Sequence, residues 1–285
     1  MTVPAPVLRV KDLSVRFRTA RGVFEAVRSV SFDLGRERVG VVGESGSGKT
    51  MMGRAIMGIA PKTARVEAEH LEFMGQDLKS LSAKQMRALR GRRISMILQD
   101  PKYSLNPLMT IGEQVAEAYR LHGSHSRHEA RERALEMLEA VQIRDPKRVY
   151  RLFPHEVSGG MGQRVMISMM LAGEPDLVIA DEPTSALDVS VQKDVLRILD
   201  RLVDERGHAL LFISHDLNLV SRFCDRVLIM YAGRVVEELS AQNLHHARHA
   251  YTQGLLASLP KLGAKRDVLP VLNRDPRWRD APAVQ

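Results

Sequence analysis

The chain has 285 residues, of which 44% are hydrophobic and 27% charged, and it contains one cysteine. These proportions are ordinary for a globular protein, and they exclude a disulfide framework and a zinc site built from cysteines. The net charge of +8 is compatible with binding to nucleic acid, with an anionic membrane surface or with a plain basic surface, and charge alone does not choose among them.

The N-terminal residues lack the basic start and long apolar core of a signal peptide. No uninterrupted apolar run reaches the about 18 residues that are needed to span a bilayer. We therefore expect a cytosolic chain, or one held at a membrane only by a partner. We expect the cysteine, Cys224, to be a small buried hydrophobic residue, because its neighbours are apolar.

Strand patterns dominate the first part of the chain. Residues 7–19 and 24–34 mix β-branched and polar residues in near alternation, which predicts strands with one exposed face. Residues 38–43 are almost all apolar and predict a strand buried on both faces. A helix is expected at 50–59, directly after a glycine-rich octet.

The stretch from about residue 100 to residue 171 has a different character. Residues 111–123, 126–141 and 163–173 carry Ala, Leu, Met, Glu and Arg at helical periodicity, and no buried-strand run interrupts them. We expect a helical subdomain here, inserted into an α/β domain.

Buried-strand patterns return at 177–181 and 209–214, with helical patterns at 189–205 and 217–223. This alternation indicates a parallel sheet with helices on its faces. Residues after this point predict a hairpin that turns at Ala232-Gly233.

The Pro- and charge-rich residues 261–285 are expected to form an irregular tail. The folded domain is therefore expected to span residues 1–260.

The octet Gly43–Thr50, GESGSGKT, matches the P-loop pattern G-x-x-x-x-G-K-[ST] between a strand and a helix. Its glycines let backbone N–H groups approach phosphates, and the helix N-terminus adds a positive dipole end. Lys49 is expected to pair with the β- and γ-phosphates and Thr50 to hold Mg²⁺. The residues expected to bind nucleotide here are Gly43, Glu44, Ser45, Gly46, Ser47, Gly48, Lys49, Thr50 and Met51.

Two carboxylates follow the strand at 177–181. Asp181 ends this strand, at the edge where doubly wound sheets bind ligands, and is expected to contact Mg²⁺. Glu182 is the next residue and is a candidate base for activating water.

A second glycine-rich segment, Ser158-Gly159-Gly160, precedes a helix that is expected to begin at Met161. It predicts a second anion site in the same chain. One ATPase domain needs only one P-loop, so we expect a head-to-tail dimer in which this segment closes over nucleotide bound to the other subunit.

Together these segments resemble the nucleotide-binding subunit of ATP-binding cassette (ABC) transporters over nearly the full chain. GESGSGKT is similar to Walker A, LVIADE (177–182) to Walker B, and VSGGM (157–161) to the signature motif. Val157 and Met161 stand where the family usually has Leu and Gln. The implied fold is a P-loop NTPase of the α/β class with a mainly parallel core sheet, an N-terminal antiparallel β-subdomain and the inserted helical subdomain.

The resemblance implies further site residues. Gln99 matches the Q-loop, SALD (185–188) the D-loop with Asp188, and His215 the switch histidine. Phe17 is the first choice for stacking on adenine, and Phe24 remains the alternative. The implied sets are then catalytic Glu182, His215 and Gln99; metal-binding Thr50, Gln99 and Asp181; and nucleotide-binding Phe17, Ser158, Gly159, Gly160 and Asp188 beside the P-loop.

Residues 99–114, 230–237 and 245–260 are similar to the dipeptide, oligopeptide and nickel importer branch. This implies an ATPase with ATP and Mg²⁺ as cofactors that drives uptake of peptides, nickel or another small solute at the cytoplasmic face of the inner membrane. The implied partners are a second ATPase subunit, identical or related, two membrane subunits and, indirectly, a solute-binding protein.

The alternatives are a soluble ABC ATPase acting on nucleic acid or ribosomes, an exporter motor and a P-loop kinase. Two cassettes in one chain, coiled-coil insertions, zinc cysteines and fused membrane spans are absent from the sequence, which disfavours the first two. A kinase leaves Ser158–Gly160 and His215 without a role.

Some members of this branch bind an iron–sulfur cluster near the C-terminus, which this sequence excludes because it offers no cysteines there. His245, His246 and His249 raise the question of a nickel site. Since further ligands are not evident, we expect a solvated helix surface instead.

Overall fold

The structure is a computed structural model that describes residues 5–20, 22–123, 125–185, 187–259 and 275–279. The chain divides into two compact units, residues 1–80 with 211–285, and residues 81–210. The division falls within strand β9 (Ala209–Ser214).

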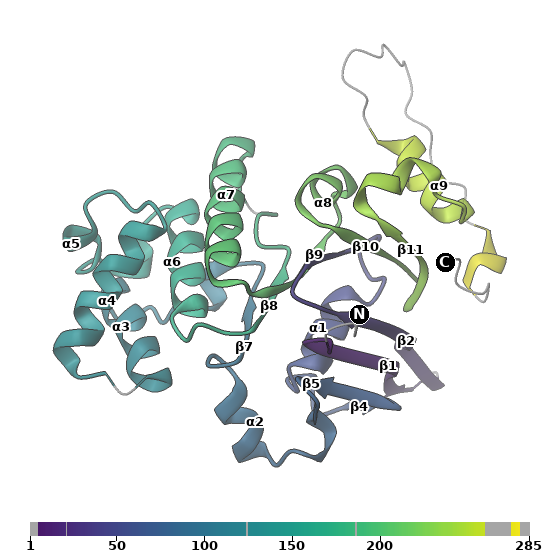
Figure 1. The fold of residues 1–285 in the computed structure, drawn as a ribbon, viewed down its shortest axis with the longest axis horizontal. Helices are drawn as coiled ribbons and strands as arrows, with labels where there is room; N and C mark the ends of the chain where they lie inside the picture. The colour runs from purple at the N-terminus through teal and green to yellow at the C-terminus, as the bar shows by residue number, and fades with distance from the viewer. Residues whose placement is uncertain (1–4, 21, 124, 186, 260–274, 280–285) are drawn as a thin grey trace, which may run out of the picture. The chain divides into compact units, whose positions relative to one another are not determined.

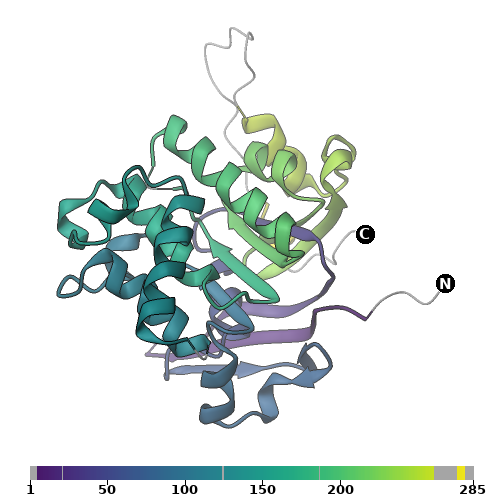
Figure 2. The same cartoon turned by 60° about the vertical axis from the view of Figure 1, so that its left-hand side comes forward.

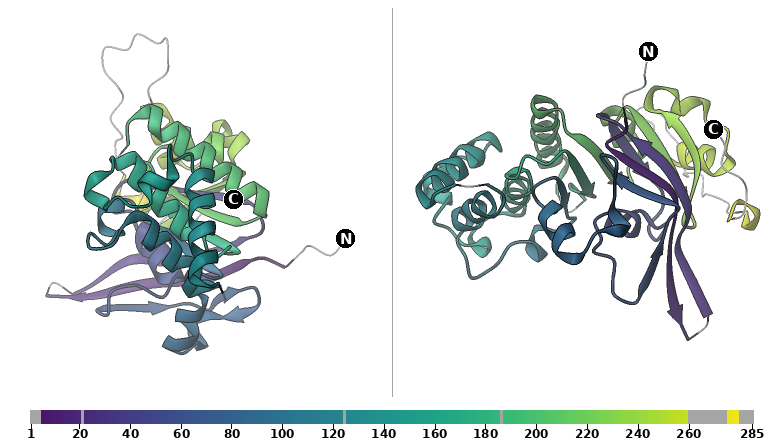
Figure 3. Two further views of the ribbon diagram at one scale, coloured as in Figure 1. Left: turned by 90° about the vertical axis from the view of Figure 1, so that its left-hand side faces the viewer. Right: turned by 60° about the horizontal axis from the view of Figure 1, so that its bottom comes forward.

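The first unit contains an antiparallel sheet built around β1, as Figure 3 shows. β1 (Leu8–Thr19) pairs with β2 (Gly22–Leu34), β4 (Ala64–Glu67) and β5 (His70–Phe73). The short strand β6 (Gln76–Asp77) pairs antiparallel with β5. Alternate side chains of β2 are buried from Val30 to Leu34, as a period of two requires for a sheet with one covered face. The predicted N-terminal antiparallel β-subdomain is confirmed.

The same unit holds a second group of strands. β3 (Arg38–Val42) pairs in parallel with β10 (Arg226–Tyr231), which forms the predicted hairpin with β11 (Arg234–Ser240). Ala232 and Gly233 turn this hairpin with φ values of 47° and 86°, as a two-residue hairpin turn demands. The helical elements of the unit are α1 (Lys49–Ile56), α8 (Leu217–Phe223), α9 (Ala250–Ser258) and the 3-10 turns η1 (Leu78–Ser80), η4 (Ala241–His246) and η5 (Pro276–Arg279) (Figure 1).

The second unit is mainly helical. Its strands β7 (Ile94–Ile97) and β8 (Leu177–Asp181) pair in parallel and are wholly buried. Its helical elements are α2 (Ala83–Leu89), η2 (Pro101–Tyr103), α3 (Ile111–His122), α4 (Arg127–Ala140), α5 (Pro146–Val149), η3 (Pro154–Glu156), α6 (Gly159–Leu171) and α7 (Val189–Arg206). The predicted inserted helical subdomain is confirmed.

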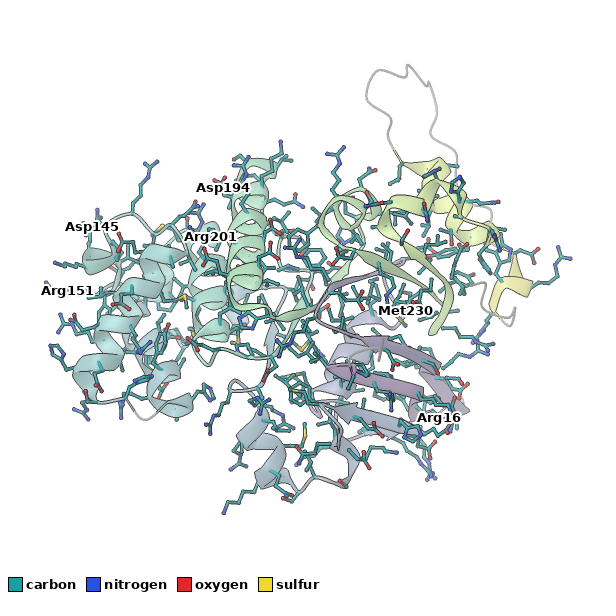
Figure 4. The ribbon with its side chains drawn as sticks, in the orientation of Figure 1. Arg16, Asp145, Arg151, Asp194, Arg201 and Met230 are labelled. Carbon is teal, nitrogen blue, oxygen red and sulfur yellow. The ribbon has the colours of Figure 1, made fainter. Side chains whose placement is uncertain are left out.

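Helices α3, α4 and α6 contact one another and lie side by side in Figure 2. Capping boxes begin two of them, since Thr110 and Ser126 each exchange hydrogen bonds with a glutamate three residues on. Arg201 of α7, labelled in Figure 4, donates a hydrogen bond to the carbonyl of Ala140 at the end of α4. The signature segment is thus carried by a packed helical scaffold.

Several local expectations differ from the structure. The strand at 94–97 was not predicted, because a segment of four residues, one of them Ser95, is too short to separate a strand from a helix by its pattern. Helix α6 begins at Gly159 and not at Met161, because Ser158 caps it through a hydrogen bond from the Met161 N–H at 3.3 Å.

The solvated helix surface predicted for three histidines is wrong for His249. His245 and His246 are exposed, but His249 is buried and caps α9 by accepting a hydrogen bond from the Tyr251 N–H. Burial lowers the pKa of His249, although nearby Glu237 opposes this shift. Cys224 is buried as predicted, and burial raises the pKa of its thiol.

In the predicted tail, residues 261–274 and 280–285 lie outside the described residues. Residues 276–279 form the 3-10 turn η5, whose Trp278 ring lies 6.2 Å from that of Tyr231. Among the helices that the structure describes, none is both long and apolar enough to cross a membrane.

Candidate nucleotide-binding site

The P-loop connects β3 to α1 within the first unit, as its sequence predicts. Gly46 and Gly48 have φ values of 82° and 103°, a region that glycine enters without strain. Gly43 is equally constrained, since a Cβ there would lie 2.1 Å from the carbonyl oxygen of Met230, which is labelled on β10 in Figure 4. The octet therefore folds as a tight loop that only these glycines allow.

Lys49 is buried at the start of α1, with 5% of its surface exposed. Its ammonium group donates hydrogen bonds to the carbonyl oxygens of Gly43 at 2.8 Å and Glu44 at 2.9 Å. The charge is thus held inside the curve of the loop. Thr50 and Met51 follow it on α1 and are half-buried.

A cavity of about 710 Å³ opens on this loop. His215, which follows β9, belongs to its wall, so the structure brings the predicted switch histidine and the P-loop together. The lining residues are Val42, Gly43, Glu44, Ser45, Gly46, Ser47, His215, Leu217, Tyr231, Ala232, Leu255, Ser258 and Leu259. Seven of these, Val42, Leu217, Tyr231, Ala232, Leu255, Ser258 and Leu259, were not predicted from the sequence.

Gly43→Ala is expected to lower the free energy of unfolding by about 2–4 kcal/mol, because the new methyl group overlaps backbone. Urea unfolding followed by circular dichroism measures the change. Gly35→Ala is the control, since its nearest neighbour would be a flexible Glu37 oxygen at 3.8 Å. Equal stabilities of the two variants would contradict the close packing of the loop against β10.

The second unit carries the carboxylates. Asp181 ends β8 and is buried, with 4% of its surface exposed. Glu182 follows with φ of 47°, a strained conformation for a side-chain-bearing residue that recurs at functional sites. The Gln99 amide, after β7, donates a hydrogen bond to the Glu182 carboxylate at 3.1 Å. The structure therefore brings the predicted Q-loop residue and the predicted base into contact.

The glycine-rich start of α6 lines a second cavity, of about 780 Å³, within the same unit. Asp188 also lines it and caps α7, accepting hydrogen bonds from the N–H groups of Val191 at 3.0 Å and Ser190 at 3.1 Å. These bonds and one from the Ser190 hydroxyl lower the pKa of Asp188. The lining residues are Gln142, Ile143, Arg144, Ser158, Gly159, Gly160, Met161, Arg164, Leu187, Asp188, Val191 and Asp194, the last of which Figure 4 labels.

The two candidates for adenine stacking lie opposite each other. Phe17 on β1 pairs with Phe24 on β2 across the first hairpin. Phe17 is half-buried, whereas Phe24 is 54% exposed. Neither lines the cavity at the P-loop, where Tyr231 supplies the aromatic side chain.

Within the described part of the chain, no group of three or more His, Cys, Asp or Glu side chains could hold a metal ion by itself. Magnesium in phosphate-transfer sites does not need such a group, because one or two protein oxygens act together with phosphate oxygens and water. The oxygen donors of Thr50, Gln99 and Asp181 are of the kind that this ion prefers.

Comparison with known proteins places these features in one family. The family model described as ABC transporter matches residues 27–185. A probable peptide ABC transporter ATP-binding protein of Sinorhizobium fredii is 48% identical over 257 residues, covering 89% of this chain and 77% of the relative. The dipeptide transport ATP-binding protein DppD of Escherichia coli is 45% identical over 265 residues, covering 92% and 81%.

A solved structure supports the same assignment. The ATP-binding cassette MJ0796, in a dimeric post-hydrolysis state bound to ADP and Pi, matches with a TM-score of 0.74 and 27% identity, covering 82% of this chain and 99% of that one. The fold and the P-loop site thus define an ATP-binding cassette.

The chain belongs to the ABC transporter family. Its reaction is the hydrolysis of ATP, coupled to transport. The resemblance stated from the motifs is confirmed, as is the predicted fold class.

Proposed function

We propose that this protein is the ATP-hydrolysing subunit of an importer for dipeptides, oligopeptides or a chemically related solute. It works with a second ABC ATPase subunit, two transmembrane permease subunits and, indirectly, a solute-binding protein, at the cytoplasmic face of the inner membrane. The observation that carries the proposal is the presence of two glycine-rich helix starts, each facing a cavity of its own. The names of the relatives, which concern peptide or dipeptide transport, support the choice of cargo.

In this proposal the ABC domain spans residues 1–260, with the helical subdomain at about 100–171. The P-loop residues Gly43 to Met51 hold the ATP phosphates through backbone N–H groups and Lys49, and Phe17, with Phe24 as the alternative, stacks on the adenine. A buried ammonium already held by loop carbonyls is preorganised to receive the β- and γ-phosphates.

Thr50, Asp181 and Gln99 would hold Mg²⁺. The Gln99 amide nitrogen donates to Glu182, so its amide oxygen is the group suited to a cation. When bound, the ion neutralises charge that develops on the β- and γ-phosphate oxygens.

Glu182 orients the attacking water and accepts its proton as the water oxygen bonds to the γ-phosphorus. The bond between that phosphorus and the bridging oxygen breaks, which releases ADP and phosphate. Gln99 positions the Glu182 carboxylate through the hydrogen bond between them. His215 stabilises the γ-phosphate from the wall of the P-loop cavity.

The second helix start acts on a nucleotide held by the partner ATPase. Ser158, Gly159 and Gly160 cap its γ-phosphate, and Asp188, which lines the same cavity, borders the site. Hydrolysis removes the ligand that joins the two subunits, so the dimer reopens and drives the membrane subunits.

The test is purification of the intact transporter, identification of its subunits by mass spectrometry, and measurement of its ATPase rate in lipid vesicles. We expect peptides delivered by the solute-binding protein to raise the rate, and nickel ions and nucleic acid to leave it unchanged. Stimulation by nickel or by another solute alone would overturn the peptide assignment. Purification without membrane subunits, with stimulation by nucleic acid or ribosomes, would overturn the importer itself.

A further inference from the structure

The C-terminal helix α9 forms part of the wall of the P-loop cavity. Leu255 and Ser258 of α9, with Leu259 after it, line the same space as Gly43 and Ser47. No P-loop chemistry requires a contribution from this part of the chain, which follows the last strand by ten residues or more in sequence.

A hydrogen bond joins this helix to the P-loop itself. The backbone N–H of Glu44 donates to the hydroxyl oxygen of Tyr251 at 3.1 Å. The carbonyl oxygen of Glu44 accepts from the Lys49 ammonium at 2.9 Å and from the Ser47 N–H at 3.1 Å. Glu44 thus links Tyr251 on one side to the phosphate-binding lysine on the other.

Tyr251 is wholly buried, with 0% of its surface exposed. Its ring centroid lies 4.5 Å from that of Tyr231 and 6.2 Å from that of Trp278. Its N–H donates to His249 Nδ1 at 3.2 Å. A side chain fixed by packing and by a hydrogen bond from its own backbone can hold its hydroxyl at a defined point.

The start of α9 is anchored in turn by a buried carboxyl group. Glu237 of β11 is wholly buried, and its Oε1 accepts hydrogen bonds from the N–H groups of Arg248 at 2.6 Å and His249 at 3.2 Å. Helix α9 is therefore tied both to β11 and to the P-loop.

We infer that Tyr251 is a positioning residue of the nucleotide site, whose hydroxyl fixes the first turn of the P-loop and transmits nucleotide binding to Trp278. The inference rests on the proposed nucleotide site and assigns part of it to the C-terminal helix. Because the Glu44 N–H donates to the Tyr251 hydroxyl, this hydrogen bond holds the loop in place, and the other N–H groups of the loop are the ones that bind phosphate.

The test uses MgADP, which is not hydrolysed, and the full chain. Trp278 is the only tryptophan, so its emission reports on the ring cluster around Tyr251. We expect MgADP to change this emission in the unmodified protein. In Tyr251→Phe we expect the MgADP Kd to rise about fivefold, as for one lost hydrogen bond, and the emission change at saturation to shrink.

Tyr119→Phe is the matched control, because it removes a hydroxyl from another buried tyrosine, on α3 in the second unit. Its MgADP Kd and emission change are expected to equal those of the unmodified chain. A melting temperature for each variant separates a local effect from a loss of folding.

Three outcomes overturn the inference. The first is a Tyr251→Phe variant whose MgADP Kd and whose emission change both equal those of the unmodified protein. The second is that Trp278 emission does not change on addition of MgADP, although calorimetry shows that the unmodified chain binds it. This result does not depend on the folding of any variant. The third is an unmodified chain that does not bind MgADP at all, which overturns the proposed nucleotide site as well and so differs from the other two.

Discussion

Glu182→Gln is expected to lower the ATP turnover rate by about a thousandfold or more while leaving ATP affinity within about twofold. Glutamine keeps an oxygen that can accept the hydrogen bond from Gln99, so the local geometry stays. It loses the carboxylate that is proposed to take a proton from water. Phosphate release from the purified transporter measures turnover, and equilibrium binding of a labelled nucleotide measures affinity.

The same variant is expected to accumulate as a closed dimer with ATP, because binding proceeds and the step that reopens the dimer does not. Size-exclusion chromatography of the variant with ATP tests this. Glu136→Gln, which removes an exposed carboxylate from α4, is the control and keeps normal turnover. Normal hydrolysis by Glu182→Gln would remove this residue from the role of base.

Lys49→Ala is expected to weaken MgADP binding by about a hundredfold, the size of effect expected for loss of charge-assisted hydrogen bonds to phosphate. The ammonium group is buried and donates to the carbonyl oxygens of Gly43 and Glu44, so alanine also leaves these two oxygens without that donor. Calorimetric titration with MgADP measures the affinity.

Two controls separate charge from loop structure. Lys84→Ala removes an exposed lysine from α2 and should bind normally. Lys49→Gln keeps hydrogen-bond donors without the charge, so it should preserve the melting temperature better than Lys49→Ala while binding nucleotide as poorly. Unchanged affinity in Lys49→Ala would contradict the role of the P-loop lysine.

The sequence predicted the elements with long or strongly patterned segments, including β3, β8, β9, α7 and the hairpin of β10 and β11. It also predicted which residues follow the strand ends, because the motifs fix the spacing from glycine or carboxylate to strand. Glu182 after β8 is one such residue, whereas its hydrogen bond from Gln99 depends on β7, which was not predicted. Short elements such as β7 carry too few residues for a period to show.

The rest depended on contacts between segments far apart in the chain. Helix α9 forms part of the wall of the P-loop cavity, about 200 residues after the P-loop in sequence. No local sequence pattern predicts such a contact. Burial of His249 is of the same kind, because it follows from the packing of β11 and of Trp278 against the start of α9. The sequence around Tyr251 indicates a likeness to one transporter branch but not a contact with the P-loop.

The buried carboxyl group of Glu237 has a consequence for the design of truncated and fused forms of this protein. This group is buried at the start of α9 and accepts hydrogen bonds from the N–H groups of Arg248 and His249. Removal of the chain from residue 248 onward would take away both of these donors and the buried Tyr251, whose ring packs 4.5 Å from that of Tyr231 and whose hydroxyl holds the P-loop. A truncated cassette that ends after β11 is therefore expected to be less stable than the full chain. Reporter domains are better fused after α9 than in place of it.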